Sequence, residues 1–380
     1  MISNQLLNRA GLFSRSIVPP LLTAITNIKD SMNKIILISF LLIEITTVSA
    51  KGIKIQELYG FPSQEEGISF GVSACFAGFI GNRLIMAGGC NFPNKPAAEG
   101  GTKRYYKGIY SCKIRKKLRL DWQLIGFLPE EAAYGVSITT KDGIICIGGK
   151  NNRHSLTSVF VIHLVNGKAV ITTLPSLPYP IDNSTGCKSS KNIFIYGAGQ
   201  ICKMNLSQID KGWTVFEKFE RQRYQPISGI LHGKITVWGG FLPKFQNDTA
   251  RLCLDGFTFG KKIKKRSIPV DELKESIALS GSASVQYGRN KVLAIGGICK
   301  DIFLIEFNHP DCTYLRHPIA WYRFNPHILL YDRNKWKILG TSKLTARAGA
   351  SLAIKKRDIY VIGGEVKPGK RTASVLKIIY

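Results

Sequence analysis

Short apolar runs that end in a pair of small residues recur along the chain. Each run has four aliphatic, aromatic or small residues followed by Gly-Gly, or by Gly-Ala in the third run. The six runs occupy residues 84–89, 144–149, 193–198, 235–240, 292–297 and 359–364. Runs this short, closed by glycine, predict buried β-strands that end in tight turns with positive φ.

The spacing of these runs indicates a repeat architecture. Successive runs begin 60, 49, 42, 57 and 67 residues apart, and repeated units near 50 residues are typical of the blades of kelch propellers. The sequence therefore predicts an all-β fold, a single six-bladed kelch-type β-propeller over residues 51–380. Aromatic strands follow several runs, and we expect Trp122, Trp213 and Trp336 to pack between blades.

The two ends of the predicted propeller complement each other. The last unit supplies three strands, near residues 348–354, 358–362 and 374–380, and lacks a fourth. The segment from Ile53 to Leu58 has the character of that missing strand. We expect it to pair with the C-terminal blade and close the ring, which removes open sheet edges.

Residues 1–50 have the pattern of a leader with a signal peptide. Asn33 and Lys34 precede an apolar stretch from Ile35 to Ile43, and small residues follow up to Ala50. This pattern predicts cleavage after Ala50 and export to the periplasm, with the first 31 residues lying upstream of the true start. Glu44 interrupts the apolar stretch well short of the roughly 20 residues that a membrane span needs. The mature form is thus expected to have no membrane span.

The net charge and the cysteine content limit the kinds of partner and ligand that we expect. The net charge is +28, of which about +26 belongs to residues 51–380, and such a field favours anionic partners without selecting one. The basic residues lie in turns with no nucleic-acid motif beside them, so no nucleic-acid partner is expected. The nine cysteines and six histidines show no metal-ligand spacing, so we expect no metal and no cofactor.

Three segments resemble one family of kelch propellers. They are residues 76–89 with Ala98–Gly100 and Tyr105–Tyr106, residues 134–137 with 147–149, and Gly363–Thr372, which is similar to a GExKPGxRT motif. Together they resemble the sialic acid mutarotases, or N-acetylneuraminate epimerases, over roughly residues 51–380. The GExKPGxRT-like segment is last here, an order that resembles the cyclically permuted branch of the family.

The resemblance implies an isomerase that interconverts the α and β anomers of N-acetylneuraminate, a small acidic sugar. It also implies that Glu365 and Arg371 of the GExKPGxRT-like segment are the catalytic residues. Anomer exchange needs a proton taken from the anomeric hydroxyl and one delivered to the ring oxygen, which a carboxylate can do. An arginine fork suits the carboxylate of the substrate.

Four further residues are candidates for substrate binding. Arg223 and Arg347 stand at strand entries, and Asn91 and Glu99 lie in the long loop after the first Gly pair. An insertion near residues 299–320 in the fifth unit is expected over one face of the ring.

Other functions stay open at this point. A non-catalytic kelch propeller that binds an acidic glycan or a protein would share every fold signal. A sialidase is disfavoured because the one Asp-box-like segment, Ser207–Trp213, has the wrong spacing, and the ligands of a copper oxidase are not evident. The oligomeric state is not predicted.

Overall fold

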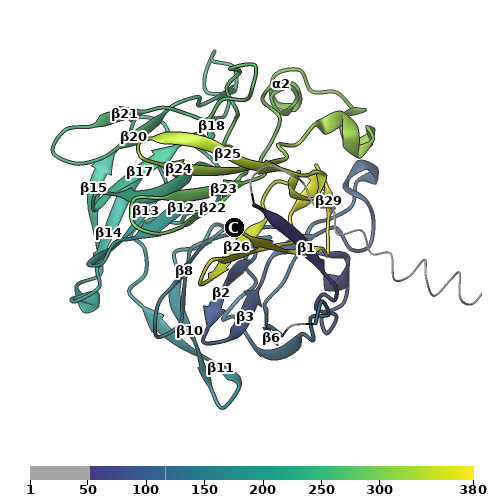
Figure 1. Cartoon of the computed structure of the whole chain (residues 1–380), viewed down its shortest axis with the longest axis vertical. Coiled ribbons are helices and arrows are strands. Elements are labelled where there is room, and N and C mark those ends of the chain that lie inside the picture. Colours follow the sequence, from purple (N-terminus) through teal and green to yellow (C-terminus); the bar gives the residue numbers. More distant parts are fainter. Residues whose placement is uncertain (1–51, 116) are drawn as a thin grey trace, which may run out of the picture. The chain divides into compact units, whose positions relative to one another are not determined.

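Each apolar run of the sequence is the second strand of a four-stranded sheet. The computed structural model describes residues 52–115 and 117–380, which form six antiparallel sheets arranged as propeller blades (Figure 1). The predicted all-β, six-bladed architecture is confirmed. These second strands are almost wholly buried, as in β9 (Ile144–Ile147), because neighbouring blades cover both of their faces.

The blades are numbered here in the order of the six runs. Blade one has β2 (Phe76–Ile80), β3 (Arg83–Ala87), β6 (Gly108–Lys113) and β7 (Gln123–Phe127). Blade two has β8 (Val136–Thr139), β9, β10 (Val159–Val165) and β11 (Lys168–Leu174). Blade three has β12 (Thr185–Lys188), β13 (Asn192–Gly197), β14 (Gln200–Asn205) and β15 (Trp213–Lys218).

The remaining blades repeat the same antiparallel order. Blade four has β16 (Ile227–Leu231), β17 (Lys234–Trp238), β20 (Gly256–Thr258) and β21 (Lys264–Arg266). Blade five has β22 (Ala283–Gln286), β23 (Val292–Ile295), β24 (His327–Asp332) and β25 (Lys335–Thr341). Blade six has β26 (Ser351–Lys355), β27 (Asp358–Ile362), β30 (Val375–Ile379) and β1 (Lys54–Leu58).

Short elements decorate the loops between the blade strands. Three two-stranded hairpins follow Gly pairs: β4 (Cys90–Asn91) with β5 (Arg104–Tyr105), β18 (Phe241–Leu242) with β19 (Arg251–Leu252), and β28 (Glu365–Lys367) with β29 (Lys370–Arg371). The insertion of blade five contains α2 (Lys300–Phe303), α3 (Ile305–Asn308), η4 (Tyr314–Arg316) and η5 (Ile319–Tyr322). Further single turns are η1 (Ile68–Phe70), η2 (Ala97–Glu99), η3 (Ile209–Lys211) and η6 (Lys343–Thr345).

The hydrophobic core lies between blades. One buried cluster joins blade six to blade one, for example Tyr360 with Phe79, and comparable clusters fill the other interfaces. The predicted role of the tryptophans is confirmed. The indole N–H groups of Trp122, Trp213 and Trp336 each donate to a carbonyl of the preceding blade or its linker, those of Gly60, Pro175 and Ser267.

The Gly pairs adopt positive φ as predicted, with one correction in blade three. Gly88 and Gly89, for instance, have φ of 64° and 98°. In blade three the two residues with positive φ are Ala198 and Gly199, not the expected pair Gly197 and Ala198. The reason is that β13 turns directly into β14 through a two-residue hairpin, whose central residues both need positive φ.

The ring closes as predicted. β1 pairs antiparallel with β30 along its whole length, from Lys54 opposite Ile379 to Leu58 opposite Val375. The first and last strands of the propeller therefore share one blade, and the outer edge of β30 is covered. The predicted leader and signal peptide, residues 1–50, lie outside the described residues.

A second ring runs around the central axis. One residue just before the first strand of each blade has positive φ, and its N–H donates to the carbonyl of the matching residue in the preceding blade. The six residues are Ala74, Tyr134, Asn183, Gln225, Gly281 and Gly349. These six N–H···O distances lie between 2.7 and 3.3 Å. The ring thus holds the six blades in register at one end of the channel.

Candidate active site

A two-stranded hairpin on blade six brings the two predicted catalytic residues together. Glu365 on β28 stands opposite Arg371 on β29, across a turn at Pro368 and Gly369. Directly opposed residues of an antiparallel pair project to the same side. The Glu365 carboxylate accepts from Nη2 of Arg371 in a charge-assisted pair.

Arg371 is buried, and one of its nitrogens is left without a partner. Its side chain is 2% exposed, against 23% for that of Glu365. Nε donates to Oγ of Ser73 at 3.1 Å, and the ring of Phe92 lies 4.8 Å from Cζ. Nη1 is buried and has no hydrogen-bond partner among the residues that the structure describes. A buried donor that is left unsatisfied is costly, so this nitrogen is suited to a ligand oxygen.

Burial and the neighbouring charge act in opposite directions on Arg371. Burial alone would lower its pKa, but the charge of Glu365, with contributions from Cys90 and Tyr134, outweighs that effect and raises the pKa. The guanidinium is therefore held as a cation. Glu365 remains partly open to solvent, so a ligand that approaches the pair meets this carboxylate first.

A tyrosine joins this pair to the central axis. The hydroxyl of Tyr134 accepts from Nζ of Lys103 at 3.1 Å and from Sγ of Cys90 at 3.4 Å. Burial, followed by Cys90 and Glu365, raises the pKa of Tyr134 well above its usual value, although Arg371 opposes the shift. Tyr134 thus keeps its proton near neutral pH and is a proton donor beside a carboxylate.

The channel along the axis has the size of a small-ligand site. Its volume is about 530 Å³, within the usual range for ligand pockets. Tyr134 lines it together with the other five residues of the hydrogen-bonded ring, and small and hydroxyl side chains such as Ser137 and Ser228 line the inner strands. Tyr134 therefore lies at the ring end of this channel, and it interacts with Glu365 and Arg371, whose side chains are not part of the channel lining.

Comparisons with known proteins decide the family. The family model described as N-acetylneuraminate epimerase matches residues 41–171 and 174–380. The chain belongs to this family. Its GExKPGxRT-like segment is the hairpin that carries Glu365 and Arg371.

Individual N-acetylneuraminate epimerases are distant relatives. The protein of that name from Salmonella typhi is 27% identical over 227 residues, which are 55% of this chain and 59% of the relative. N-acetylneuraminate epimerase 1 from Escherichia coli O6:H1 is 28% identical over 54% of this chain and 59% of its own length. The chain thus spans about three fifths of the length of these relatives. A solved structure titled "Structure of YjhT" aligns at 24% identity with a TM-score of 0.46, over 54% of this chain and 64% of that chain.

The other four predicted residues of this epimerase-family chain make no hydrogen bond through their side chains to Glu365, Arg371 or Tyr134 within the described residues. Asn91 is 2% exposed. Its Nδ2 donates to the carbonyls of Gly67 and Gly71, and its Oδ1 accepts from the hydroxyl of Tyr106, each at 2.8 Å. Glu99 is exposed at the end of η2.

The two predicted arginines make structural contacts. Arg223 pairs with Asp255 at 2.6 Å and lies over the ring of Phe257. Arg347 is 3% exposed and donates to three backbone carbonyls, those of Leu344, Gly363 and Ser374. Burial, only partly offset by Glu57, lowers the pKa of Arg347 to about 10. Their role in substrate binding stays a prediction.

Five residues of the site were not selected from the sequence. Tyr134 precedes the first strand of blade two, and the other four, Ser73, Phe92, Lys103 and Cys90, surround Arg371 and Tyr134 and come from blade one. A signal was present for Cys90, because it follows the first Gly pair in the place that Glu365 takes after the last one. Its backbone pairs with Ser73 just as that of Glu365 pairs with Ala348.

In the part of the chain that the structure describes, no group of three or more His, Cys, Asp or Glu side chains could hold a metal ion. The nine cysteines are free thiols, and seven of them are buried. Within residues 52–115 and 117–380, no helix has the length and apolar character to cross a bilayer.

Proposed function

We propose that this protein accelerates the interconversion of the α and β anomers of N-acetylneuraminate. One observation carries the proposal. A reachable carboxylate, Glu365, is held against a buried guanidinium, Arg371, that keeps one nitrogen free, and the protonated hydroxyl of Tyr134 lies beside them. Together they can bind an acidic sugar and move protons to and from it.

The chemistry of ring opening assigns a role to each group. Glu365 takes the proton of the anomeric hydroxyl while the bond between the anomeric carbon and the ring oxygen breaks. Tyr134 delivers a proton to that ring oxygen, which gives the open-chain ketone. Rotation about the bond to the carbonyl carbon, followed by the reverse transfers, forms the other anomer. Protons balance over the cycle, and no redox partner is needed.

Arg371 fits the carboxylate of the substrate. A guanidinium presents its donors in a planar fork, and charge-assisted hydrogen bonds of this kind are stronger than those between neutral groups. The unpartnered Nη1 and the Nη2 now bound to Glu365 are the two donors that such a carboxylate would take. Substrate binding would then release Glu365 to act as the base.

Membership of the epimerase family and the names of the relatives support the proposal. Those relatives are matched over part of their length only, so their activity is transferred here as part of the proposal. The main alternative is a propeller that binds an acidic glycan or a protein without catalysis. Such a propeller would have the same fold, but it would not need Glu365 as a base.

The test is the rate of anomer exchange of N-acetylneuraminate, measured by NMR exchange spectroscopy. We expect the protein to accelerate exchange and Glu365→Gln to lower that acceleration by about a hundredfold, since general-base catalysis contributes roughly 10² to 10⁴. Glu272→Gln, an exposed acid outside the site, is the matched control. Sugar binding without acceleration by the folded parent would favour the non-catalytic alternative.

We also propose export to the periplasm, from the leader pattern of residues 32–50. Expression of the full chain followed by cell fractionation and N-terminal sequencing tests this. We expect a mature N-terminus at Lys51 in the periplasmic fraction. An uncleaved chain in the cytoplasmic fraction would contradict the proposal.

A further inference from the structure

The strand order divides the turns of the propeller between two ends. In each antiparallel blade the turn from the first to the second strand lies at the end opposite the Gly pair and the β28–β29 hairpin. We call this end the basal face. It consists of the turns at residues 81–82, 140–143, 189–191, 232–233, 287–291 and 356–357, with the outer turns between third and fourth strands at residues 114–115, 117–122, 166–167, 206–212, 259–263 and 333–334 and the strand ends that adjoin them.

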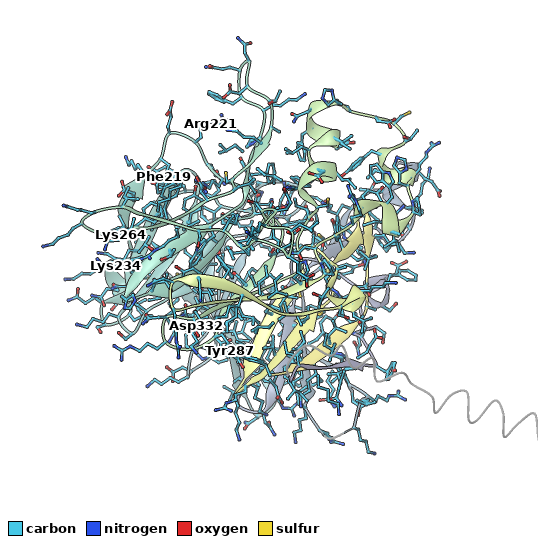
Figure 2. All side chains as sticks on the ribbon, turned by 45° about the horizontal axis from the view of Figure 1, so that its top comes forward. Phe219, Arg221, Lys234, Lys264, Tyr287 and Asp332 are labelled. Carbon is cyan, nitrogen blue, oxygen red and sulfur yellow. The ribbon has the colours of Figure 1, made fainter. Side chains whose placement is uncertain are left out.

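Exposed basic side chains recur on the basal face. Five of the six inner turns carry or adjoin them, at Lys141, Lys191, Lys234, Arg289, Lys356 and Arg357. The outer turn of blade four adds Lys261, Lys262, Lys264 and Lys265, all exposed. Figure 2 shows Lys234 and Lys264 near each other, apart from Arg221 at the other end.

Few acids lie near this face. Asp332, Asp358 and Asp121 pair with Lys291, Lys377 and Arg119 respectively, and the other two, Asp142 and Asp210, are exposed. At the other end of the blades the basic residues have acidic partners more often. Pairs there include Arg104 with Glu66, Arg221 with Asp248, Arg223 with Asp255 and Lys300 with Glu275. The large net charge of the chain is therefore concentrated on the basal face.

Aliphatic side chains stand among these lysines. Ile263 is 52% exposed between Lys262 and Lys264, and Val165 is 53% exposed at the end of β10, close to Lys168. Apolar tips with basic neighbours fit the boundary between lipid headgroups and acyl chains, where the lysines reach the phosphates. A nucleic-acid backbone offers such tips no apolar medium.

A hollow on the same face could take a single headgroup. It has a volume of about 460 Å³ and is lined by Ile114, Lys355, Lys356, Arg357, Asp358 and Tyr360. Three of these side chains are basic, and Asp358 is already paired with Lys377. Lysine and arginine side chains bind phosphate through charge-assisted hydrogen bonds, so the three basic side chains of this hollow suit a phosphate.

We propose that the basal face docks the protein reversibly on a bilayer surface rich in anionic phospholipids. The face that carries Glu365, Arg371 and the ring end of the channel then points to the water. Docking rests on charge and on shallow insertion of the Ile263 turn, so it requires no spanning segment. It is independent of the proposed mutarotase activity.

The test is co-sedimentation of the full chain with large unilamellar vesicles. One vesicle set is pure phosphatidylcholine, which reports any binding by apolar segments alone, and the other contains about one third phosphatidylglycerol. We expect binding to the anionic vesicles that weakens as salt is raised, because salt screens exposed charges. The triple variant Lys261→Gln, Lys262→Gln, Lys264→Gln should lower the partition coefficient by about a hundredfold, since each basic residue near the surface contributes about fivefold.

The matched control removes the same charge from the other end of the blades. Lys244→Gln, Lys274→Gln and Lys343→Gln replace exposed lysines there, and we expect vesicle binding within about twofold of the parent. Equal loss in both triple variants would overturn the proposal, because net charge and not the basal face would then be responsible. Absence of binding to anionic vesicles at low salt would overturn it as well.

A third variant separates lipid from nucleic acid. Ile263→Ser keeps every charge and removes the apolar tip, so we expect vesicle binding to fall several-fold while binding to a duplex DNA, followed by fluorescence anisotropy, is unchanged. No effect of Ile263→Ser on vesicle binding, together with tighter binding to the duplex than to the vesicles, would overturn the proposal and favour a nucleic-acid partner.

Discussion

Two buried arginines of blade six show how similar residues take different roles. Arg347 uses its N–H groups on backbone carbonyls, whereas Arg371 pairs with a carboxylate and keeps Nη1 free. Their pKa values accordingly move in opposite directions, lowered to about 10 for Arg347 by burial and raised for Arg371 by its acidic neighbour against the effect of burial. The first arginine ties backbone segments together, and the second is suited to a ligand.

This contrast predicts that Arg347→Met mainly affects stability. We expect the free energy of unfolding in urea to fall by about 3 kcal/mol, because three backbone carbonyls, one of them buried, lose a charged donor. The rate of anomer exchange per folded molecule should stay near that of the parent. Arg357→Met, at an exposed arginine, is the control. Unchanged stability with lost activity would instead support the substrate-binding role that the sequence suggested for Arg347.

Tyr134 is predicted to be the acid of the reaction. Tyr134→Phe keeps the ring and removes the hydroxyl, so we expect exchange to slow by about a hundredfold with little change in stability. The raised pKa of Tyr134 keeps its proton in place as pH rises. Activity of the parent should therefore show no alkaline loss between about pH 7 and about pH 9. Tyr179→Phe, at a tyrosine 45% exposed, is the control, and full activity of Tyr134→Phe would exclude the role.

At the scale of elements, the Gly pairs connect neighbouring blades as well as turning the chain. The N–H of Gly364 donates to the carbonyl of Val72 at 2.9 Å, and a Cβ on Gly363 would lie 2.1 Å from that same oxygen. The φ of Gly363 is 58°, close to the 50° that Ala198 adopts in blade three. The close approach between blades, more than φ, is what requires glycine at position 363.

A pair of substitutions tests this reading. Gly363→Ala should lower the free energy of unfolding by about 2 kcal/mol or more, because the contact with the Val72 carbonyl forces the blades apart. Ala198→Gly should change it by less than about 1 kcal/mol, because the gain from relieving positive φ is offset by the entropy of glycine. Urea denaturation measures the free energy of unfolding of both variants. Changes of equal size in the two variants would show that φ alone requires glycine at position 363.

At the scale of the whole molecule, stability depends on closing the ring. β1 covers β30 and contributes Ile55 and Leu58 to the interfaces with blades five and one. The hydrogen-bonded ring from Ala74 to Gly349 closes the same circle near the axis. Blade six therefore holds together the two ends of the propeller, and it also carries Glu365 and Arg371.

Loss of β1 should consequently disturb the candidate active site as well as the fold. For a chain that starts at residue 60, compared with one that starts at residue 51, we expect a lower and broader unfolding transition, because an edge opens and two interfaces lose apolar contacts. Exchange activity should fall with it, since Ser73 and Phe92 of blade one would no longer be held against Arg371. Circular dichroism and NMR exchange measure the two effects. Identical unfolding of both chains would contradict the closure argument.

The sequence by itself determined the features that arise from local pattern. Apolar runs with glycine pairs specify buried strands and turns, their repetition specifies blades, and complementary chain ends predict closure. The sequence could also predict that Glu365 and Arg371 lie close together, because a short hairpin joins them. It could not predict that the turn shifts to Ala198 and Gly199, because the composition of the run does not say which two residues form a tight hairpin.

Only the tertiary structure decided which distant residues meet. Ser73 and Arg371 are 298 positions apart and touch because the ring closes between blades six and one. Whether Asn91, Arg223 and Arg347 face a ligand or their own fold depends on partners that packing supplies, such as the Gly67 carbonyl and Asp255. The concentration of basic turns on one face likewise follows from the up-and-down course of the strands. Local pattern sets strands and turns, whereas long-range contacts depend on the closed circle as a whole.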